Sequence, residues 1–168
     1  VILEGLGLPA ATIVPSVAIG WDSTLEPREY SIAAAKTLME AAGFDYADLT
    51  ADGDSYSDSF FDITVRSPNT NPARNAWSAL VAETLPKIGI GVTEHVSTGW
   101  AEIIPRTFGS DVEPPVYADG GFDIFFVGYS WDLDVDPTGL FEKAALRPNG
   151  GNFYNFENTE YDQLLTAY

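Results

Sequence analysis

The segment Phe60-Phe-Asp-Ile-Thr-Val-Arg66 is rich in aromatic and β-branched residues, which is typical of a β-strand. After a short turn comes Asn71-Pro72, a favoured N-cap and first residue of a helix. The helical pattern ends before Gly89-Ile-Gly-Val92, which begins a second strand expected to run to about Val96. A strand, a helix and a strand with short joins predict a βαβ unit with parallel strands, so the chain is assigned to the α/β class.

The helix of this unit has an apolar face that we expect to pack on the sheet. The residues of that face are Trp77, Leu80, Val81 and Leu85. Pro86 lies near the end of the helical pattern. The last turn is therefore expected to be kinked or shortened.

A further strand is expected at Phe122-Asp-Ile-Phe-Phe-Val127, which is apolar enough to be buried. It leads into Gly128-Tyr-Ser-Trp-Asp-Leu-Asp-Val-Asp-Pro137, a stretch that combines aromatic rings with carboxylates. Ligands of α/β sheets bind at the carboxyl ends of the strands. We therefore place the candidate ligand site in residues 128–137.

Shorter elements are expected around these strands. Helices are predicted at 31–43, 98–108, 138–146 and 159–168, an irregular surface segment at 1–30, and a solvated loop at 45–59. In the first of these helices, Ser31 is the expected N-cap and Gly43 the expected stop.

Acidic residues greatly outnumber basic ones, with 25 Asp and Glu against 8 Lys and Arg and a net charge of -17. A hydrophobic content of 45% is that of a folded protein, so this charge lies on the surface. Such a surface repels nucleic acids and anionic membranes, and no nucleic-acid partner is expected. Dispersed carboxylates with few lysines also suit concentrated salt, which screens self-repulsion, so a halophilic archaeon is the expected source.

The length of 168 residues is sufficient for a single domain with one core. Cysteine is absent from the sequence, which excludes disulfides and thiolate metal sites. The sequence starts at Val1 without a signal-peptide pattern, and we interpret it as a piece of a longer protein. Residues 5–20 are apolar, but Pro9 and Pro15 favour a loop over a membrane span.

Four segments, in this order, resemble the extracytoplasmic substrate-binding proteins of peptide-type ABC transporters, the family 5 solute-binding proteins. They are Tyr30-Ser-Ile-Ala-Ala-Ala-Lys-Thr-Leu-Met-Glu-Ala-Ala-Gly-Phe44, Asn71-Pro72 with Lys87-Ile-Gly-Ile-Gly-Val92, Phe122-Asp-Ile-Phe-Phe-Val-Gly-Tyr-Ser-Trp-Asp132, and Gly151-Asn-Phe-Tyr-Asn-Phe-Glu-Asn-Thr-Glu-Tyr-Asp-Gln-Leu-Leu165. Each segment is a weak signal, but the set covers nearly the whole chain.

The resemblance implies a periplasmic-binding-protein-like lobe of class II, with a mixed β-sheet flanked by helices. Residues 1–168 would then be most of the C-terminal lobe of a two-lobed protein that closes over a small peptide. The implied partners are the N-terminal lobe of the same full-length chain and an ABC transporter permease. The implied location is the extracellular face of the cytoplasmic membrane, with a lipid anchor at an N-terminus outside this sequence. Neither a cofactor nor a metal is expected.

The resemblance also implies the ligand-binding residues. In family members that bind peptides, the aspartate that aligns with Asp132 pairs with the free amino group of the peptide. The strand end beside it supplies Tyr129, Ser130 and Trp131, and Asn155 or its neighbour Asn152 is a further candidate. Tyr129 stands where the family usually has tryptophan, so the site departs from the common pattern.

Other interpretations of the same residues stay open. Asp132 also suits a turn, and the aromatic residues also suit a core. If Tyr129 and Trp131 instead stack on sugar rings, the ligand is an oligosaccharide.

A calcium-binding or structural module is a further alternative, because Asp132, Asp134 and Asp136 imitate the start of a calcium loop. Against it, Pro137 occupies the position of the required glycine. An enzyme is not expected, since the only histidine, His95, has no evident catalytic partner and no phosphate-binding loop is present.

Overall fold

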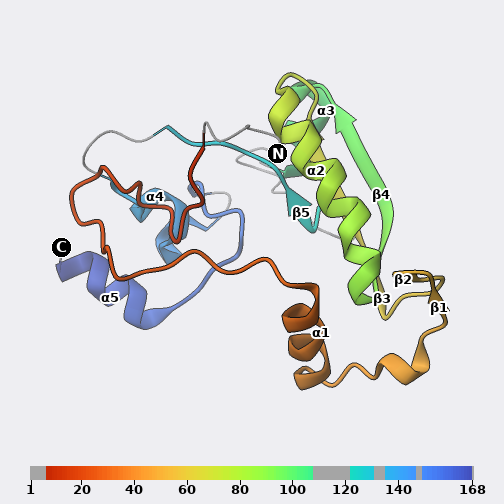
Figure 1. The fold of residues 1–168 in the computed structure, drawn as a ribbon. Helices are drawn as coiled ribbons and strands as arrows, with labels where there is room; N and C mark the ends of the chain where they lie inside the picture. The colour runs from red at the N-terminus through yellow and green to blue at the C-terminus, as the bar shows by residue number, and fades with distance from the viewer. Residues whose placement is uncertain (1–6, 108–121, 131–134, 147–148, 168) are drawn as a thin grey trace.

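Three parallel strands form the main sheet of the molecule (Figure 1). In spatial order they are β4 (Ile90–Thr98), β3 (Phe61–Pro68) and β5 (Ile124–Phe125). The computed structural model describes residues 7–107, 122–130, 135–146 and 149–167. β3 pairs with β4 along its whole length and with β5 at Val65 and Arg66. The expected parallel βαβ unit is confirmed, and the third strand joins it on the opposite side of β3.

Helix α2 (Pro72–Thr84) connects β3 to β4 and begins as the sequence predicts. Asn71 caps it, because the Asn71 Oδ1 accepts a hydrogen bond from the Arg74 N–H at 3.0 Å. After Thr84 the chain tightens into a 3₁₀ turn at Leu85–Ile88, which contains Pro86. This is the shortened last turn expected from that proline, and Gly89 ends it with a φ of 76°.

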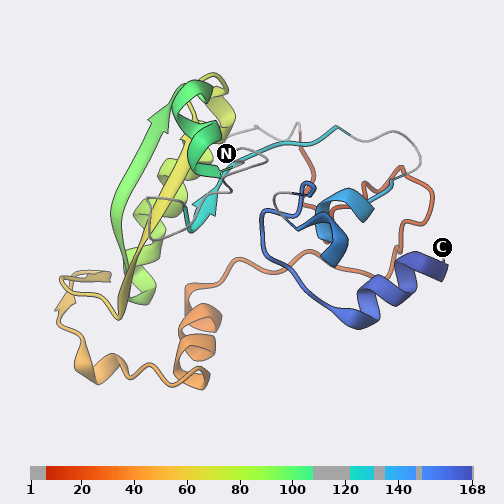
Figure 2. The ribbon, with the colours of Figure 1, turned by 180° about the vertical axis from the view of Figure 1, so that it is seen from behind.

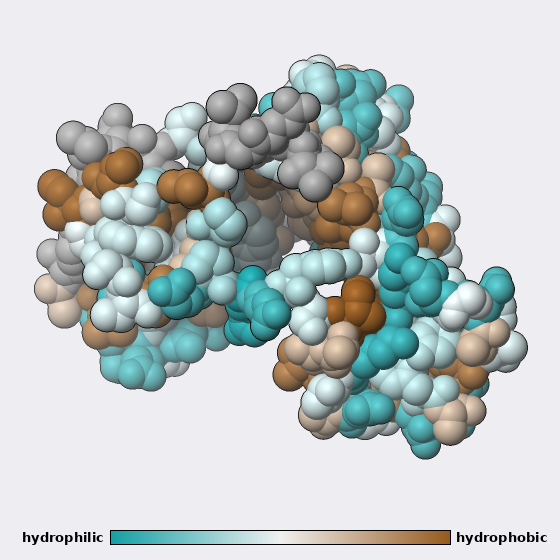
Figure 3. Space-filling view, viewed as in Figure 1, coloured by the Kyte–Doolittle hydropathy of each residue, from teal (hydrophilic) through white to brown (hydrophobic). Residues whose placement is uncertain are grey.

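The expected apolar face of α2 is wrong for two of its residues. Trp77 is 36% exposed and Leu80 is 53% exposed, whereas Ser78 is fully buried. The Ser78 hydroxyl lies 2.9 Å from Nε2 of His95 on β4, so a small polar residue lies at this contact between helix and sheet. The bulky residues next to it in the sequence point elsewhere. Hydrophobic residues therefore reach the surface along α2 (Figure 3).

Helix α3 (Trp100–Thr107) follows β4 and covers part of the sheet. It lies within the helix expected at 98–108 and contains Pro105, and Phe108 lies outside the described residues. Ile103 of α3 and Val65 of β3 are both completely buried and form the centre of the small core. Burying an aliphatic side chain of this size stabilises a fold by about 1.5 to 3 kcal/mol.

Helix α1 (Ile32–Ala41) precedes the sheet and is capped by Ser31, whose Oγ accepts from the Ala34 N–H at 3.1 Å. The segment expected to be a plain loop also contains the antiparallel strands β1 (Ala51–Asp52) and β2 (Ser55–Tyr56). The family resemblance implies a mixed sheet. In the described chain the main sheet is parallel, and the antiparallel pairing occurs in the separate sheet of β1 and β2.

The C-terminal part contains α4 (Thr138–Phe141), a 3₁₀ turn at Lys143–Ala145 and α5 (Thr159–Ala167). The expected short helix over 138–146 is therefore split, and the expected final helix is confirmed. The irregular N-terminal segment runs beside α4 and α5 in both ribbon views (Figures 1 and 2). In the described parts of the chain, every helix is too short or too polar to cross a bilayer.

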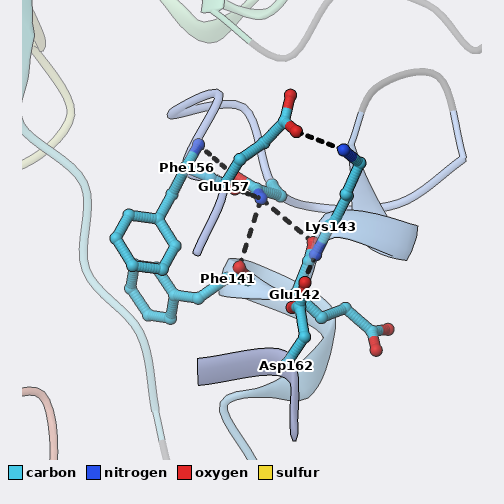
Figure 4. A network of polar contacts seen from close by, with 7 residues as sticks. Phe141, Glu142, Lys143, Phe156, Glu157 and Asp162 are labelled. Carbon is cyan, nitrogen blue, oxygen red and sulfur yellow. Dashed lines mark hydrogen bonds and ion pairs between the residues drawn. The ribbon is translucent and has the colours of Figure 1, made fainter. Parts of the chain in front are cut away.

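A polar network holds the C-terminal part together (Figure 4). The Asp162 side chain of α5 accepts from the Lys143 N–H at 3.0 Å, and the Lys143 ammonium pairs with Glu157. Asn152 is completely buried, and its Nδ2 donates to the carbonyls of Phe141 and Glu142. The short helix α4, the following turn and the start of α5 are therefore tied to one another.

Candidate functional site

The carboxyl ends of the three parallel strands lie at one edge of the sheet, where Pro68, Thr98 and Phe125 end their strands. The chain leaves β3 toward β4 on one side and later returns to form β5 on the other. The strand order therefore reverses between β3 and β5. Open α/β sheets bind ligands in the crevice outside such a reversal point. This edge is the one that the sequence predicts as the ligand site.

Arg74 and Gly128 meet at this reversal point. Arg74 belongs to the first turn of α2, which follows β3, and Gly128 follows β5. The two segments approach so closely that a Cβ placed on Gly128 would overlap the Arg74 guanidinium, at 2.9 Å from its Cζ. A side chain at position 128 would force the end of the Arg74 side chain to move. The close contact brings the half-buried cation of Arg74 to the beginning of residues 128–137.

Tyr129 links this edge to the C-terminal part. Its ring is 42% exposed, and its hydroxyl group hydrogen bonds with that of Tyr154, which precedes α5. Partial burial, together with the hydrogen bond to Tyr154 and the charge of that residue, raises the pKa of Tyr129 far above the usual tyrosine value. The phenol therefore stays neutral over the physiological pH range and is available as a donor or acceptor.

Tyr154 is also part of an aromatic cluster on the C-terminal part of the molecule. Its members are Phe141, Phe153, Tyr154, Phe156 and Tyr161. The rings of Phe141 and Tyr154 stack at 5.5 Å with an interplanar angle of 12°. Tyr154 is 45% exposed and Phe156 is 38% exposed. The aromatic cluster thus presents flat apolar surface beside Tyr129.

The structure describes three of the five site residues predicted from the sequence. Ser130 is exposed directly after Tyr129 at the sheet edge. Asn155 is exposed too, and it is the only non-glycine residue with a positive φ, 53°, in the described chain. Trp131 and Asp132 lie outside the described residues. Whether these five side chains touch a ligand stays a prediction.

Two of the other acidic and amide candidates have structural partners. Asn152 is buried in the polar network described above, so of the pair Asn152 and Asn155 only the latter is open to solvent. The Asp136 carboxylate accepts from the Thr138 N–H at 3.0 Å at the start of α4, and hydrogen bonds from Thr138 lower the pKa of Asp136. No group of three or more potential metal-ligating side chains comes together within the described residues.

Arg74 and Tyr154 were not predicted from the sequence as site residues. Arg74 is an ordinary third residue of a capped helix, and Tyr154 lies within the last family-like segment without a motif of its own. The available signal was topological. Once β3 and β5 are known to be parallel neighbours, the connections after both strands must meet at one edge.

A separate hollow of about 420 Å³ lies in the N-terminal segment. Apolar residues such as Leu8, Ile13 and Trp21 line it, and all of its lining comes from residues 8–21. None of the site residues contributes to this hollow. We therefore do not assign the ligand to it.

Comparison with known proteins identifies relatives of this chain. The oligopeptide-binding protein AppA of Bacillus subtilis (strain 168) is 26% identical over an alignment of 169 positions, which covers 98% of this chain and 28% of AppA. The chain thus spans less than a third of that relative. The structure of AppA in complex with a nonapeptide matches 99% of this chain and 31% of its own, with a TM-score of 0.74 and 23% identity.

The oligopeptide-binding protein from Thermus thermophilus, complexed with a pentapeptide, covers 99% of this chain and 30% of its own, with a TM-score of 0.71 and 17% identity. At these identities the structural likeness shows the fold, and the expected periplasmic-binding-protein-like class is confirmed. The family model for bacterial extracellular solute-binding proteins, family 5 Middle, matches residues 1–151. Its members are solute-binding proteins that act outside the cytoplasm. The chain belongs to the family 5 extracellular solute-binding proteins.

Proposed function

We propose that this chain is most of the C-terminal lobe of a substrate-binding receptor for an ABC importer. The receptor captures di- or oligopeptides by hinge closure and delivers them to a membrane permease. The observation that carries the proposal is the open sheet edge between β3 and β5, with Tyr129 and Ser130 exposed on it, in a chain of this family. The relatives reported above that are named for their ligand bind oligopeptides.

Peptide recognition at this edge assigns roles to the five site residues. Asp132 pairs with the terminal ammonium group of the peptide, because a carboxylate and an ammonium form a strong charge-assisted hydrogen bond. Tyr129 and Trp131 contact peptide side chains, while Ser130 and Asn155 supply polar contacts. The neutral phenol of Tyr129, tied to Tyr154, supports its part in this arrangement.

The N-terminal lobe of a longer chain covers the other side of the ligand in this proposal. The length of the relative AppA supports it, because this chain covers only 28% of AppA. A lipid anchor on the longer chain holds the receptor at the outer face of the cytoplasmic membrane.

Calorimetric titration of the full-length receptor with short peptides, in molar salt, tests the proposal. Asp132→Asn keeps the shape of the side chain and removes its charge, so it should weaken peptide binding by about 1.5 to 3 kcal/mol. Asp136→Asn is the matched control, since Asp136 lies in the same stretch but accepts a hydrogen bond from the Thr138 N–H. Peptide binding that both variants leave unchanged would return Asp132 to a structural role.

An oligosaccharide is the second candidate ligand, and the exposed aromatic rings favour it. Tyr129, Tyr154 and Phe156 are each between 38% and 45% exposed, and flat aromatic faces stack well on sugar rings. The same titration with oligosaccharides separates the two ligand classes. If the receptor binds oligosaccharides and no peptides, and Tyr154→Ala abolishes the sugar binding, the oligosaccharide proposal replaces the peptide proposal.

A further inference from the structure

We propose that Arg74 binds a carboxylate group of the ligand and so makes the receptor select for anionic peptides. This inference rests on the proposed peptide-binding function and adds a specificity-determining residue to it. None of the five residues predicted from the sequence supplies a positive charge. The site as predicted would therefore leave any ligand carboxylate without a partner.

The position of Arg74 is the first argument. Its guanidinium lies against Gly128, at the point where the strand order reverses between β3 and β5. Gly128 immediately precedes Tyr129 and Ser130, which are both exposed at the same edge. A ligand that lies along residues 128–130 therefore passes next to this cation.

The lack of a protein partner is the second argument. Within the described residues, the Arg74 guanidinium makes no ion pair and no hydrogen bond. Other cations of the described chain are paired: Arg66 with Glu94 at 2.9 Å, Lys87 with Asp54 at 2.6 Å, and Lys143 with Glu157. In a chain with 25 acidic residues and 8 basic ones, an unpaired and half-buried arginine is unusual.

The energetics favour an anion at this position. A guanidinium that is partly removed from water loses solvation, and a carboxylate that accepts two of its N–H bonds restores those interactions. The planar fork of arginine matches the two oxygens of a carboxylate better than a lysine ammonium does. Because the contact is partly buried, salt screens it less than it screens an exposed pair.

The carboxylate has two sources in a peptide, namely the C-terminus and the side chain of Asp or Glu. Two pairs of probes distinguish them. Alanine peptides of about two to five residues, as free acids and as C-terminal amides, report on the terminus. Amidated peptides that carry either Glu or Gln at one position report on the side chain.

The experiment is calorimetric titration of the full-length receptor, in molar salt, with these probes. The wild-type protein should bind the carboxylate member of at least one pair roughly 10- to 100-fold more tightly than its neutral partner. Arg74→Gln should remove that preference. Arg74→Lys keeps the charge without the fork, so it should retain a reduced preference.

Arg28→Gln is the matched control, because Arg28 is exposed on the N-terminal segment and should leave the preference intact. Circular dichroism and thermal melting check that each variant is folded. If Arg74→Gln does not fold, Arg74→Lys provides the test instead. Peptides that bind wild type and Arg74→Gln with the same preference would overturn the role of Arg74 alone. A receptor that binds none of the peptides would overturn the proposed function and this inference with it.

Discussion

The side chain of Asn152 pairs with the backbone of Phe156 in both directions. Its Nδ2 donates to the Phe156 carbonyl at 2.7 Å, and its Oδ1 accepts from the Phe156 N–H at 3.1 Å. The same Nδ2 reaches the carbonyls of Phe141 and Glu142, and the side chain is completely buried. The side-chain amide of Asn152 thus links the backbone at the end of α4 to the backbone of the segment before α5.

Asn152→Ala should lower the free energy of unfolding by about 2 to 4 kcal/mol, because several buried backbone groups lose their partner. Urea unfolding followed by circular dichroism measures this loss. Asn158→Ala is the control, since Asn158 only caps exposed α5, through the Tyr161 N–H at 3.0 Å, and should cost about 1 kcal/mol. Equal losses for the two variants would contradict the role of Asn152 as the central contact.

Asn155 adopts a left-handed backbone conformation with a φ of 53°. Asn155→Gly should therefore fold with nearly unchanged stability, whereas Asn155→Ala should cost about 1 kcal/mol through backbone strain. Thermal unfolding measures both effects. Peptide titration of Asn155→Gly then isolates the side chain, because the backbone is preserved. If the peptide affinity of this variant is unchanged, Asn155 serves the backbone conformation and does not contact the ligand.

Gly89 and Gly43 both have positive φ values, 76° and 97°, but their surroundings differ. A Cβ on Gly89 would lie 2.7 Å from Leu49 Cδ1 and from Phe60 Cε2, whereas a Cβ on Gly43 meets nothing within 4 Å. Gly43→Ala should cost only backbone strain, about 1 kcal/mol. Gly89→Ala should lower the free energy of unfolding by about 1 to 3 kcal/mol more, because the added methyl group also clashes with Leu49 and Phe60. Chemical unfolding measures the stability lost by each variant. Equal losses in the two variants would disprove this account.

Tyr129 should ionise later than an ordinary tyrosine. Its folded-state pKa is raised and its charged form is the deprotonated one, so the associated stability is present below about pH 10 and is lost as the pH rises beyond that. Alkaline titration followed by tyrosinate absorbance should show a late component that Tyr129→Phe removes. Tyr154→Phe removes the hydrogen-bond partner and should lower the pKa of Tyr129. A wild-type titration without a late component would contradict the partial burial of Tyr129 and its hydrogen bond to Tyr154.

The net charge of -17 should make the stability of the protein depend on salt. In dilute buffer the carboxylates repel one another, and in molar salt the screening length falls to about 3 Å. The melting temperature should therefore rise from dilute to molar potassium chloride. Sucrose at a similar osmotic strength does not screen charge and serves as the control. An unchanged melting temperature in salt would remove the argument for a halophilic source.

Much of the local structure could be predicted from the sequence. The caps Ser31 and Asn71, the shortened turn at Pro86 and the parallel pairing of β3 with β4 are all as expected. These features depend on residues close together in the chain, or on a strand–helix–strand pattern with one common outcome. The β1–β2 pair was missed, since each of its strands has only two residues and carries no periodicity.

The side of α2 that faces the sheet was the clearest wrong prediction. Hydrophobic spacing favoured Trp77 and Leu80, yet the close contact with β4 is made by Ser78. Periodicity identifies a stripe of apolar residues on a helix, but it does not say which protein surface covers that stripe. A small residue lets helix and sheet approach closely, and that choice depends on both partners.

Local chemistry in the amino-acid sequence was enough to determine the α/β class and the main helix ends. The tertiary structure alone decided that Arg74 meets Gly128 and that Tyr129 meets Tyr154. Each of these contacts joins residues that lie far apart in the sequence. Caps and periodicity act over a few residues, whereas such contacts depend on strand order and on how the elements pack. The cation and the phenol pair of the site therefore became visible only in the folded chain.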